Sequence, residues 1–408
     1  MESGLNADVI YLDFAKAFDK VDHGILIRKL ASMGIGGRII AWIHNFLSNR
    51  QQTVKVLNAI SNPACVISGV PQGTVLGPIL FLTFVGDIDE GLKCAEASSF
   101  ADDTRVVMRV GDEDDHRAMQ RDLETLYEWS DNNNMMFNGA KFQHLCYGPQ
   151  LDRQRYLTPD GDQIQMFDDV RDLGISMSAN GGFEVQVNEC VMKGRQLAGR
   201  IFRTFETRES YPMMTVYKAL VLPALEYCCQ IWSPKKLYLI KKVESVQRNF
   251  TARVAGTNGM SYRERLDYLK IYSLERRRDR YAIIYIWKII QGLAPNLMGR
   301  DRIKYASTNM RLGRCCVLPT LNHSAPRYVQ TLRENSFAIH GPRLFNVLDK
   351  ELRNFDGTLD TFKGRLDKFL ATISDAPLDL NYPQVAASNS LLAQVAQGRL
   401  ELRSLPQR

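Results

Sequence analysis

Two adjacent carboxylates between two strand-like runs constrain the fold of this chain more than any other feature. Asp102 and Asp103 join the runs Ala97–Ala101 and Thr104–Val110, so the spacing predicts a hairpin with both carboxylates at its tip. Asp13 ends another apolar run, where a charge has no packing role. Carboxylates crowded in a dry site repel one another. The pattern therefore favours a metal centre, since bound cations relieve that repulsion, with solvated turn residues as the alternative interpretation.

The charge is distributed unevenly along the chain. Residues 1–180 carry 16 basic and 25 acidic residues, whereas residues 181–408 carry 36 basic and 20 acidic ones. An acidic half followed by a basic half predicts a metal-binding part joined to a part that grips a polyanion. Within the basic half, we expect an arginine run near the start of a predicted helix to contact nucleic-acid phosphate, with a solvated helix face as the alternative. The run consists of Arg276, Arg277, Arg278 and Arg280.

The hydrophobic periodicity changes near residue 180. Before it, strand-like runs alternate with helical patterns, which predicts an α+β sandwich of the split βαβ kind with helices on one face of the sheet. After it, helices dominate, and from residue 375 the periodicity is weak except at 391–400, which predicts a partly disordered tail. No apolar stretch is long enough to cross a bilayer and the first twenty residues are too charged for a secretory signal. We therefore expect an intracellular protein without a membrane partner.

Three motifs follow one another in a specific order. They read YLDFAKAFDKVDH at 11–23, SGVPQGTVLGPILF at 68–81 and FADDT at 100–104. This set resembles the A, B and C motifs of reverse transcriptases from non-LTR (LINE-type) retrotransposons, especially the jockey kind. The resemblance covers roughly residues 7–370, and an ordered set is far more specific than a lone FADD. Further similar segments lie at 45–56, 137–148, 170–177, 224–234 and 265–278.

The resemblance implies a two-metal site. Asp13 and Asp102 would be the principal ligands of two Mg²⁺ ions, with Mn²⁺ as a substitute. Asp103 would help to hold the metal on the primer side, and the backbone carbonyl of Phe14 would complete the shell around the nucleotide metal. Such ions activate a primer 3′-hydroxyl for attack on the α-phosphate and neutralise the triphosphate, so that pyrophosphate leaves.

The resemblance also implies roles in selecting and holding the nucleotide. Phe18 occupies the position of the steric gate that selects dNTPs, although a core phenylalanine is the alternative. Gln72 and Gly73 would pack against the incoming nucleotide and the template base, Gly73 because a side chain there would collide. Lys141 matches a lysine proposed to protonate the leaving pyrophosphate, with an ordinary surface lysine as the alternative.

The domain organisation follows from the same resemblance. We expect a reverse transcriptase palm at 1–180, a thumb-like helical region at 181–255, a basic helical region at 256–374 and a tail at 375–408. The implied partners are an RNA template, a DNA primer and dNTPs, the implied location is the nucleus, and no protein partner is indicated. The chain begins twelve residues before Asp13. The fingers region and the endonuclease that precede the palm in this family are thus expected to be missing, and activity in isolation to be impaired.

Two other interpretations stay open. A group II intron reverse transcriptase has the same palm, but the segment ALEYCCQIWSP at 224–234 and the helices after it look like the jockey type. A non-catalytic remnant that only binds nucleic acid is the second alternative. The presence of all three carboxylates, Asp13, Asp102 and Asp103, argues against long decay.

Overall fold

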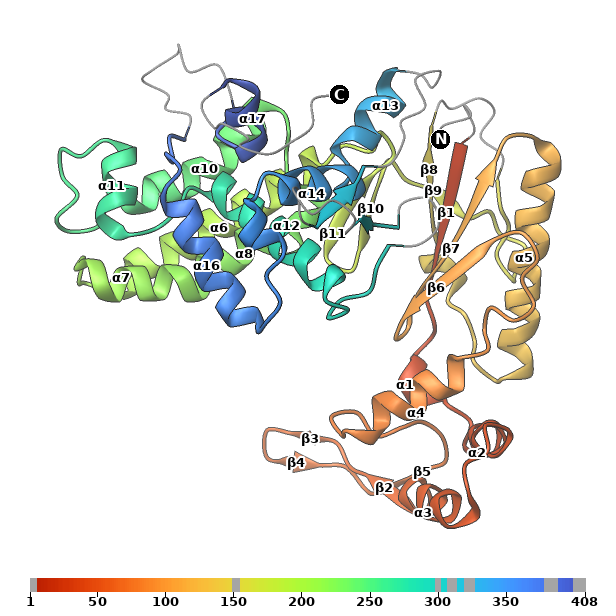
Figure 1. Ribbon diagram of the computed structural model, residues 1–408. Coiled ribbons are helices and arrows are strands. Elements are labelled where there is room, and N and C mark those ends of the chain that lie inside the picture. The colour runs from red at the N-terminus through yellow and green to blue at the C-terminus, as the bar shows by residue number, and fades with distance from the viewer. Residues whose placement is uncertain are drawn as a thin grey trace. The chain divides into compact units, whose positions relative to one another are not determined.

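The structure, a computed structural model, describes residues 6–148, 155–297, 302–306, 314–318, 327–377 and 388–398 (Figure 1). It contains two compact units. Unit 1 comprises residues 3–174 and 178–181, and unit 2 comprises residues 175–177 and 182–408. Most of the tail predicted from residue 375 onward lies outside the described residues, and the described part of it includes the short helix α17.

Unit 1 holds the N-terminal strands and helices. Its elements are β1 (Asn6–Leu12), α1 (Ala17–Lys20), α2 (His23–Ser32), α3 (Gly37–Leu47), β2 (Arg50–Gln52), β3 (Lys55–Val56), β4 (Ala59–Ile60), β5 (Ala64–Val66), α4 (Leu76–Val85), β6 (Glu96–Phe100), β7 (Asp103–Val110), α5 (Glu113–Asn132), the 3₁₀ helix η1 (Gly139–Lys141), β8 (Gln143–Tyr147), β9 (Gln165–Met166) and β10 (Asp169–Asp172). Strand β11 (Ile175–Ser178) pairs with β10.

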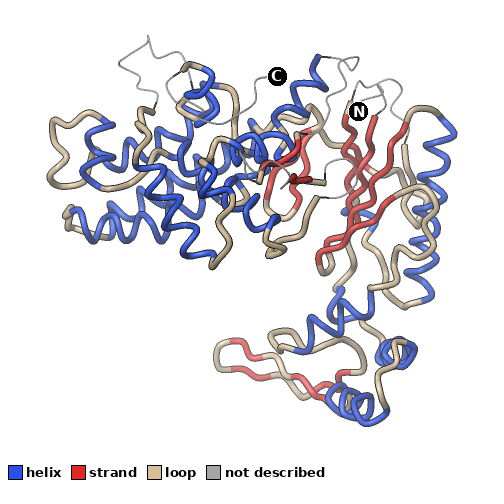
Figure 2. The backbone as a smooth tube through the Cα atoms, viewed as in Figure 1, coloured by secondary structure: helices blue, strands red, loops and turns tan. Residues whose placement is uncertain are grey.

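A mixed five-stranded sheet forms the centre of unit 1. Its strand order is β6-β7-β1-β8-β9, and every pair is antiparallel except β8 with β9 (Figure 2). Side chains alternate between the faces of a strand. Ile10 and Val106 therefore point to the same face, where they join a buried core with Met119 and Leu123 of α5. The α+β class predicted from the sequence is confirmed.

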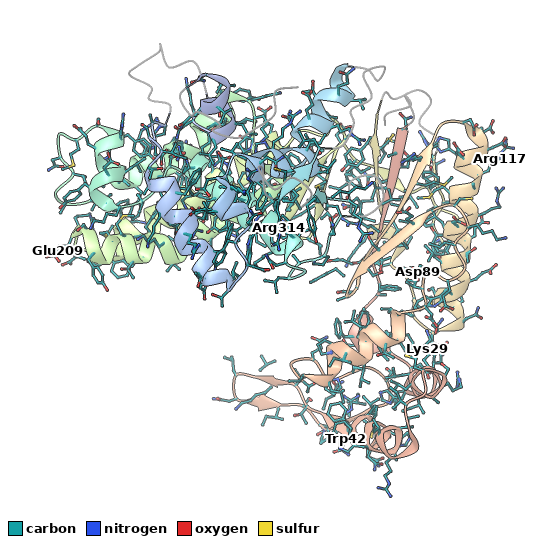
Figure 3. The ribbon with its side chains drawn as sticks, in the orientation of Figure 1. Lys29, Trp42, Asp89, Arg117, Glu209 and Arg314 are labelled. Carbon is teal, nitrogen blue, oxygen red and sulfur yellow. The ribbon has the colours of Figure 1, made fainter. Side chains whose placement is uncertain are left out.

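Helices α1 to α4 and the short strands β2 to β5 gather near the end of the sheet where β1 ends (Figure 1). Lys29 of α2 joins this group to the rest of the unit. Its ammonium donates to Asp87 Oδ1 at 2.6 Å and lies 4.9 Å from the ring centroids of both Phe84 and Trp129 (Figure 3). These contacts tie α2 to α4 and α5 through charge and cation–π attraction. Trp42 of α3, by contrast, is exposed.

A buried carboxylate on α5 fixes the start of β6. Asp122 is 3% exposed and accepts hydrogen bonds from the backbone N–H groups of Lys93, Cys94 and Ala95 at 3.1, 2.8 and 2.7 Å. These residues lead directly into β6, whose far end is the Asp102–Asp103 turn. Hydrogen bonds to charged groups are stronger than neutral ones. Helix α5 thus holds the base of the hairpin.

We expect Asp122→Ala to lower the free energy of unfolding of unit 1 by about 3 kcal/mol, because three backbone N–H groups, that of Ala95 buried and the other two partly buried, lose their charged acceptor. Urea denaturation followed by circular dichroism of the full chain measures the change. Asp131→Ala removes an exposed aspartate from the same helix and should change stability by less than about 0.5 kcal/mol. Equal effects of the two substitutions would contradict the assigned role of Asp122.

Unit 2 is mainly helical. Its elements are α6 (Glu184–Thr204), α7 (Ser210–Val216), the π-helix η2 (Tyr217–Val221), α8 (Leu222–Glu226), α9 (Cys229–Trp232), α10 (Leu237–Thr251), α11 (Tyr262–Leu269), α12 (Leu274–Ile290), β12 (Lys304–Ala306), β13 (Cys315–Val317), α13 (Arg327–Asn335), α14 (Phe337–Asn346), α15 (Lys350–Arg353), α16 (Leu359–Ala371) and α17 (Leu391–Ala396).

Helix α12 runs between two apolar clusters of unit 2. One contains Tyr217, Trp232 and Phe250, and the other contains Trp287 of α12 itself, stacked on Phe362 with 4.6 Å between ring centroids. A helix that is apolar on all sides is buried by its neighbours. None of the helices that the structure describes is long and apolar enough to span a membrane.

Candidate active site

Strand pairing brings the predicted carboxylates together. The antiparallel register of β1 and β7, extended one step beyond its last pair, puts Asp13 opposite Asp103. Side chains directly opposite each other in such a pair have Cβ atoms about 4.5–5.5 Å apart. Strands β6 and β7 are joined by a two-residue turn, Ala101–Asp102, in which Ala101 has a φ of 54°. The turn places Asp102 next to Asp103, in an exposed position.

The charged side chains around Asp103 interact electrostatically. Partial burial, followed by the nearby carboxylates of Asp102, Asp13 and Asp172, raises the pKa of Asp103 above its usual value. The ammonium of Lys141 donates a hydrogen bond to Asp13 Oδ2 at 3.0 Å. A concentration of negative charge attracts cations, and Lys141 already supplies one.

A cavity of about 670 Å³ lies beside these side chains. Its lining contains both acids and bases from strands that are far apart in the sequence, including Asp13, Asp103, Arg105, Lys141, Arg171 and Asp172. The cavity is open to solvent and its walls are partly polar, as expected of a site for a charged, hydrophilic ligand.

The donor atoms fit a hard divalent cation. Carboxylate and carbonyl oxygens are the ligands that Mg²⁺ prefers. The Phe14 carbonyl lies next to Asp13 in the chain and would be the carbonyl ligand of such an ion. However, no group of three His, Cys, Asp or Glu side chains within the described ranges is arranged to hold a metal ion. The residues fit Mg²⁺ in chemistry and charge, although Asp102 is not among the residues that line the cavity.

The second motif forms a turn that packs against the first. The carbonyl oxygen of Gly69 accepts hydrogen bonds from His23 Nε2 at 2.9 Å and from Arg50 Nη2 at 2.6 Å. Gly69 has a φ of +84°, and a Cβ atom here would lie 2.7 Å from the backbone of Asp19. Only glycine both adopts this positive φ without strain and has no Cβ atom to collide with the Asp19 backbone. The motif is therefore fixed to the segment that follows Asp13.

Phe18, Gln72 and Gly73 are not among the residues that line the cavity. Phe18 is half-buried and stacks on Phe81 with 4.4 Å between ring centroids, while its carbonyl accepts a hydrogen bond from Val70 N at 2.8 Å. Gln72 is exposed. A Cβ atom on Gly73 would meet no atom of this chain within 4 Å, so its φ of +79° is what requires glycine here. Their roles toward a nucleotide stay predictions.

The predicted phosphate-binding arginines lie in the interior of unit 2. Arg276 is 0% exposed and donates to the carbonyl oxygens of Ile373 and Ser374 at 3.4 and 3.0 Å. Arg278 is also buried. Neither guanidinium can reach a phosphate at the surface. For these two residues the expected exposed basic face is wrong, because the N-terminal turns of α12 are enclosed by packing.

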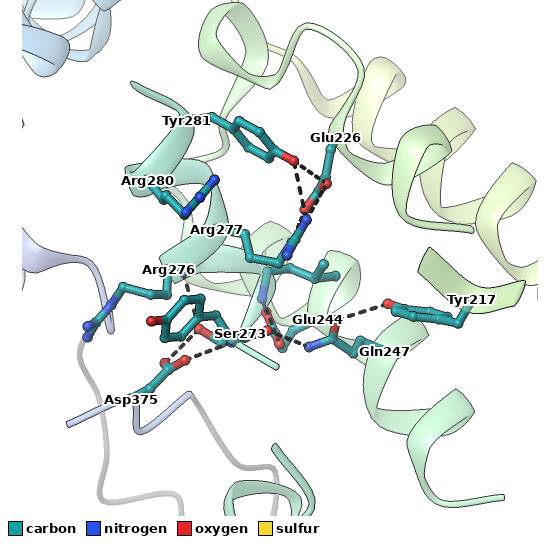
Figure 4. A network of polar contacts seen from close by, with 12 residues as sticks. Tyr217, Glu226, Glu244, Gln247, Ser273, Arg276, Arg277, Arg280, Tyr281 and Asp375 are labelled. Atoms are coloured by element: carbon teal, nitrogen blue, oxygen red, sulfur yellow. Dashed lines mark hydrogen bonds and ion pairs between the residues drawn. The ribbon is translucent and has the colours of Figure 1, made fainter. Parts of the chain in front are cut away.

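The other two arginines of the run are paired with the chain's own carboxylates. Arg277 binds both carboxylate oxygens of Glu226, at 3.0 Å for the longer contact (Figure 4). Arg280 binds both oxygens of Asp367 at 2.6 and 2.9 Å. A guanidinium engaged by two oxygens of one carboxylate forms a strong, directed ion pair. These pairs help to hold unit 2 together, and contact of Arg277 and Arg280 with phosphate stays a prediction.

Sequence reasoning missed three residues that line the cavity. Arg105 lies two residues beyond Asp103 on the same strand, and Arg171 and Asp172 come from β10. Two signals were available for them. The period-2 alternation of a strand places Arg105 on the same face as Asp103, and Arg171 and Asp172 fall in the similar segment 170–177.

Sequence comparison identifies relatives of this chain. Residues 3–177 match the family described as reverse transcriptase (RNA-dependent DNA polymerase). The chain is 24% identical over 60% of its length to the probable RNA-directed DNA polymerase from transposon X-element of Drosophila melanogaster, covering 28% of that protein. It is 23% identical over 78% of its length to the polymerase from mobile element jockey of the same species, covering 35%. The chain thus spans about a third or less of these relatives.

Solved structures with some likeness are telomerases. The apo telomerase of Candida tropicalis aligns with 70% of this chain and 46% of that chain, at 11% identity and a TM-score of 0.37. The telomerase of Candida albicans in complex with a TWJ fragment of telomeric RNA aligns with 65% and 46%, at 11% identity and a TM-score of 0.32.

Proposed function

Because residues 3–177 form a reverse transcriptase domain related to the RNA-directed DNA polymerases of the jockey, X-element and BS elements, we propose that this chain extends a DNA primer on an RNA template. The substrates would be dNTPs and a primed template, and the product strand would grow by one nucleotide with each released pyrophosphate. The jockey-type relatives favour a non-LTR retrotransposon enzyme over the group II intron alternative.

The observation that carries the proposal is the meeting of Asp13 and Asp103 across adjacent strands, beside a cavity with cationic side chains. The raised pKa of Asp103 reflects, after burial, the repulsion from Asp102 and Asp13. A site that concentrates carboxylates in this way favours cations, and reverse transcriptases generally use divalent metal ions. We propose Mg²⁺ as that metal.

Different residues of this chain would bind the metal ions and donate the proton. Asp13, Asp102 and Asp103 would hold two Mg²⁺ ions together with the Phe14 carbonyl. Bound there, the ions supply the positive charge that lowers the pKa of the primer hydroxyl and stabilises the leaving group. Lys141, whose ammonium donates to Asp13 Oδ2 at 3.0 Å, would give a proton to the departing pyrophosphate.

Two further contacts would select and align the substrates. The ring of Phe18 would exclude a ribose 2′-hydroxyl and so favour dNTPs over NTPs. Gln72 and Gly73, on the turn that Val70 fixes to Phe18, would pack against the nucleotide and the template base. Holding the reacting groups in line can supply several kcal/mol of the barrier.

Primer extension tests the proposal. The full chain is incubated with a primed RNA template and dNTPs, with Mg²⁺, with Mn²⁺ and with EDTA. We expect template-dependent extension that needs the metal and that falls when NTPs replace dNTPs. Binding of the primed template without extension under either metal would instead favour the non-catalytic alternative.

A further inference from the structure

One wall of the cavity is formed by β10, which follows β9, the strand at the edge of the sheet. Strand β9 pairs in parallel with β8, and the chain then continues into β10, which brings Arg171 and Asp172 to the cavity. The Phe167 N–H donates to the carbonyl oxygen of His144 at 2.9 Å, which fastens the start of this segment to β8. Beyond Phe167, an ion pair adds a second attachment of this wall to the sheet.

Arg105 provides that attachment. Its Nε donates to Ser98 Oγ on β6 at 2.9 Å, and its Nη1 binds Asp172 Oδ2 on β10. One guanidinium therefore links three strands, because Arg105 itself belongs to β7. Arg105 also lies on the same face of β7 as Asp103, two residues away, so the link lies directly beside the carboxylates.

The ion pair of Arg105 with Asp172 also neutralises one negative charge in the cavity. The Asp172 side chain is 13% exposed and lines the cavity together with Asp13 and Asp103. An unpaired third carboxylate would repel the phosphates of a nucleic acid. Arg171, the neighbouring cation of the wall, is exposed and forms no hydrogen bond or ion pair with the residues that the structure describes. It is therefore free to bind a phosphate.

We propose that Arg105 is a positioning residue for polymerisation: through Asp172 it holds the β10 wall, with Arg171, against the sheet, so that a strand of nucleic acid is bound with its end at Asp13 and Asp103. The inference rests on the proposed function. Arg105 acts through Asp172 and not by touching the reacting atoms. Its loss weakens capture of the primed template and leaves the chemical step of bound complexes largely intact.

The test compares Arg105→Ala, Asp172→Ala, the double variant and the exchanged pair R105D/D172R in the full chain. We expect each single variant to raise the KM for primed template about tenfold with kcat changed less than threefold, since a contact to the template that is equally strong in the ground state and the transition state affects KM alone. The double variant should be no worse than either single one, and the exchanged pair should recover at least half of the loss. Arg109→Ala removes an exposed arginine from the same strand, outside the cavity, and should leave KM unchanged.

Amide hydrogen exchange of the peptide 165–173 provides a readout that needs no activity. Exchange in this peptide should rise in both single variants and return in the exchanged pair, even if the wild-type chain extends no primer. The positioning role fails if exchange is unchanged, or if Asp172→Ala behaves like wild type while Arg105→Ala does not. It also fails if kcat falls with KM unchanged. If Arg105→Ala does not fold, the exchanged pair and Asp172→Ala decide the question.

Discussion

Replacing Asp103 by Asn is expected to lower RNA-templated DNA synthesis by about three orders of magnitude without destabilising the fold. The substitution keeps the size of the side chain but removes the charge of a carboxylate that we propose as a metal ligand, and a loss of about 4 kcal/mol of transition-state stabilisation slows a reaction about a thousandfold. Folding should not suffer, because repulsion from Asp102 and Asp13 contributes to the raised pKa of Asp103 in the native chain. Single-turnover primer extension and thermal unfolding measure the two effects separately.

Asp89→Asn is the matched control for Asp103→Asn. Asp89 is an exposed aspartate of unit 1 and does not line the cavity, so the same change of charge and size should leave synthesis within about twofold (Figure 3). Asp13→Asn should behave like Asp103→Asn if both hold metal. A variant at Asp103 that keeps more than a tenth of the wild-type rate would exclude it from the metal site.

The convergence of Asp13 and Asp103 could be predicted because it depends on local signals. Each residue ends or begins a strand with a clear apolar run, and the turn between β6 and β7 is short. The opposite wall could not be predicted in the same way. Arg105 and Asp172 are 67 residues apart, and their contact depends on β9 pairing with β8 through only two residues, a strand too short to show periodicity.

The environment of the arginine run of α12 was difficult to predict from the sequence for a different reason. Four arginines in five residues resemble a solvated basic face, yet their partners Glu226 and Asp367 lie 51 and 87 residues away. One local signal did point to burial. The same helix continues with apolar residues on every side from Ala282 to Ile290, as in a helix enclosed by its neighbours. The apolar C-terminal half of the helix predicts the environment of the charges at its start better than the charges themselves do.

The buried polar network of unit 2 surrounds Glu244 (Figure 4). This side chain is 2% exposed and accepts hydrogen bonds from the Tyr262 hydroxyl and, at 3.1 and 3.0 Å, from Leu274 N. Gln247 donates to the same Tyr262 hydroxyl at 3.0 Å. Burial raises the pKa of Glu244 from 4.5 to about 7, although the Tyr262 hydrogen bond and the charge of Arg278 oppose this shift. The carboxyl is thus protonated in the native state over a pH range in which the unfolded chain ionises it.

This difference makes the stability of unit 2 depend on pH. Between pH 4.5 and pH 7 the native chain binds a proton at Glu244 that the unfolded chain has lost, so the free energy of unfolding must fall as pH rises. We expect Glu244 alone to contribute a loss on the order of 2–3 kcal/mol from pH 5 to pH 8. Asp279, whose pKa burial raises to about 7, adds to this loss. His340 acts in the opposite direction: burial lowers its pKa to about 3, so below pH 6.5 the unfolded chain binds a proton at this imidazole that the native chain lacks.

Glu244→Gln isolates the contribution of this one group. The amide is similar in shape and always neutral, so the variant should keep the fold, lose the decline in stability that Glu244 contributes between pH 5 and pH 8, and equal or exceed wild-type stability at pH 8. Thermal unfolding followed by circular dichroism at pH 5, 6, 7 and 8 measures the difference in slope between the variant and the wild type, with the exposed Glu206→Gln as the matched control that should retain the wild-type slope. A Glu244→Gln chain with the wild-type slope would show that Glu244 is already ionised in the folded state. In that case the Tyr262 and Leu274 hydrogen bonds, together with the Arg278 charge, outweigh the cost of burying the charged carboxylate.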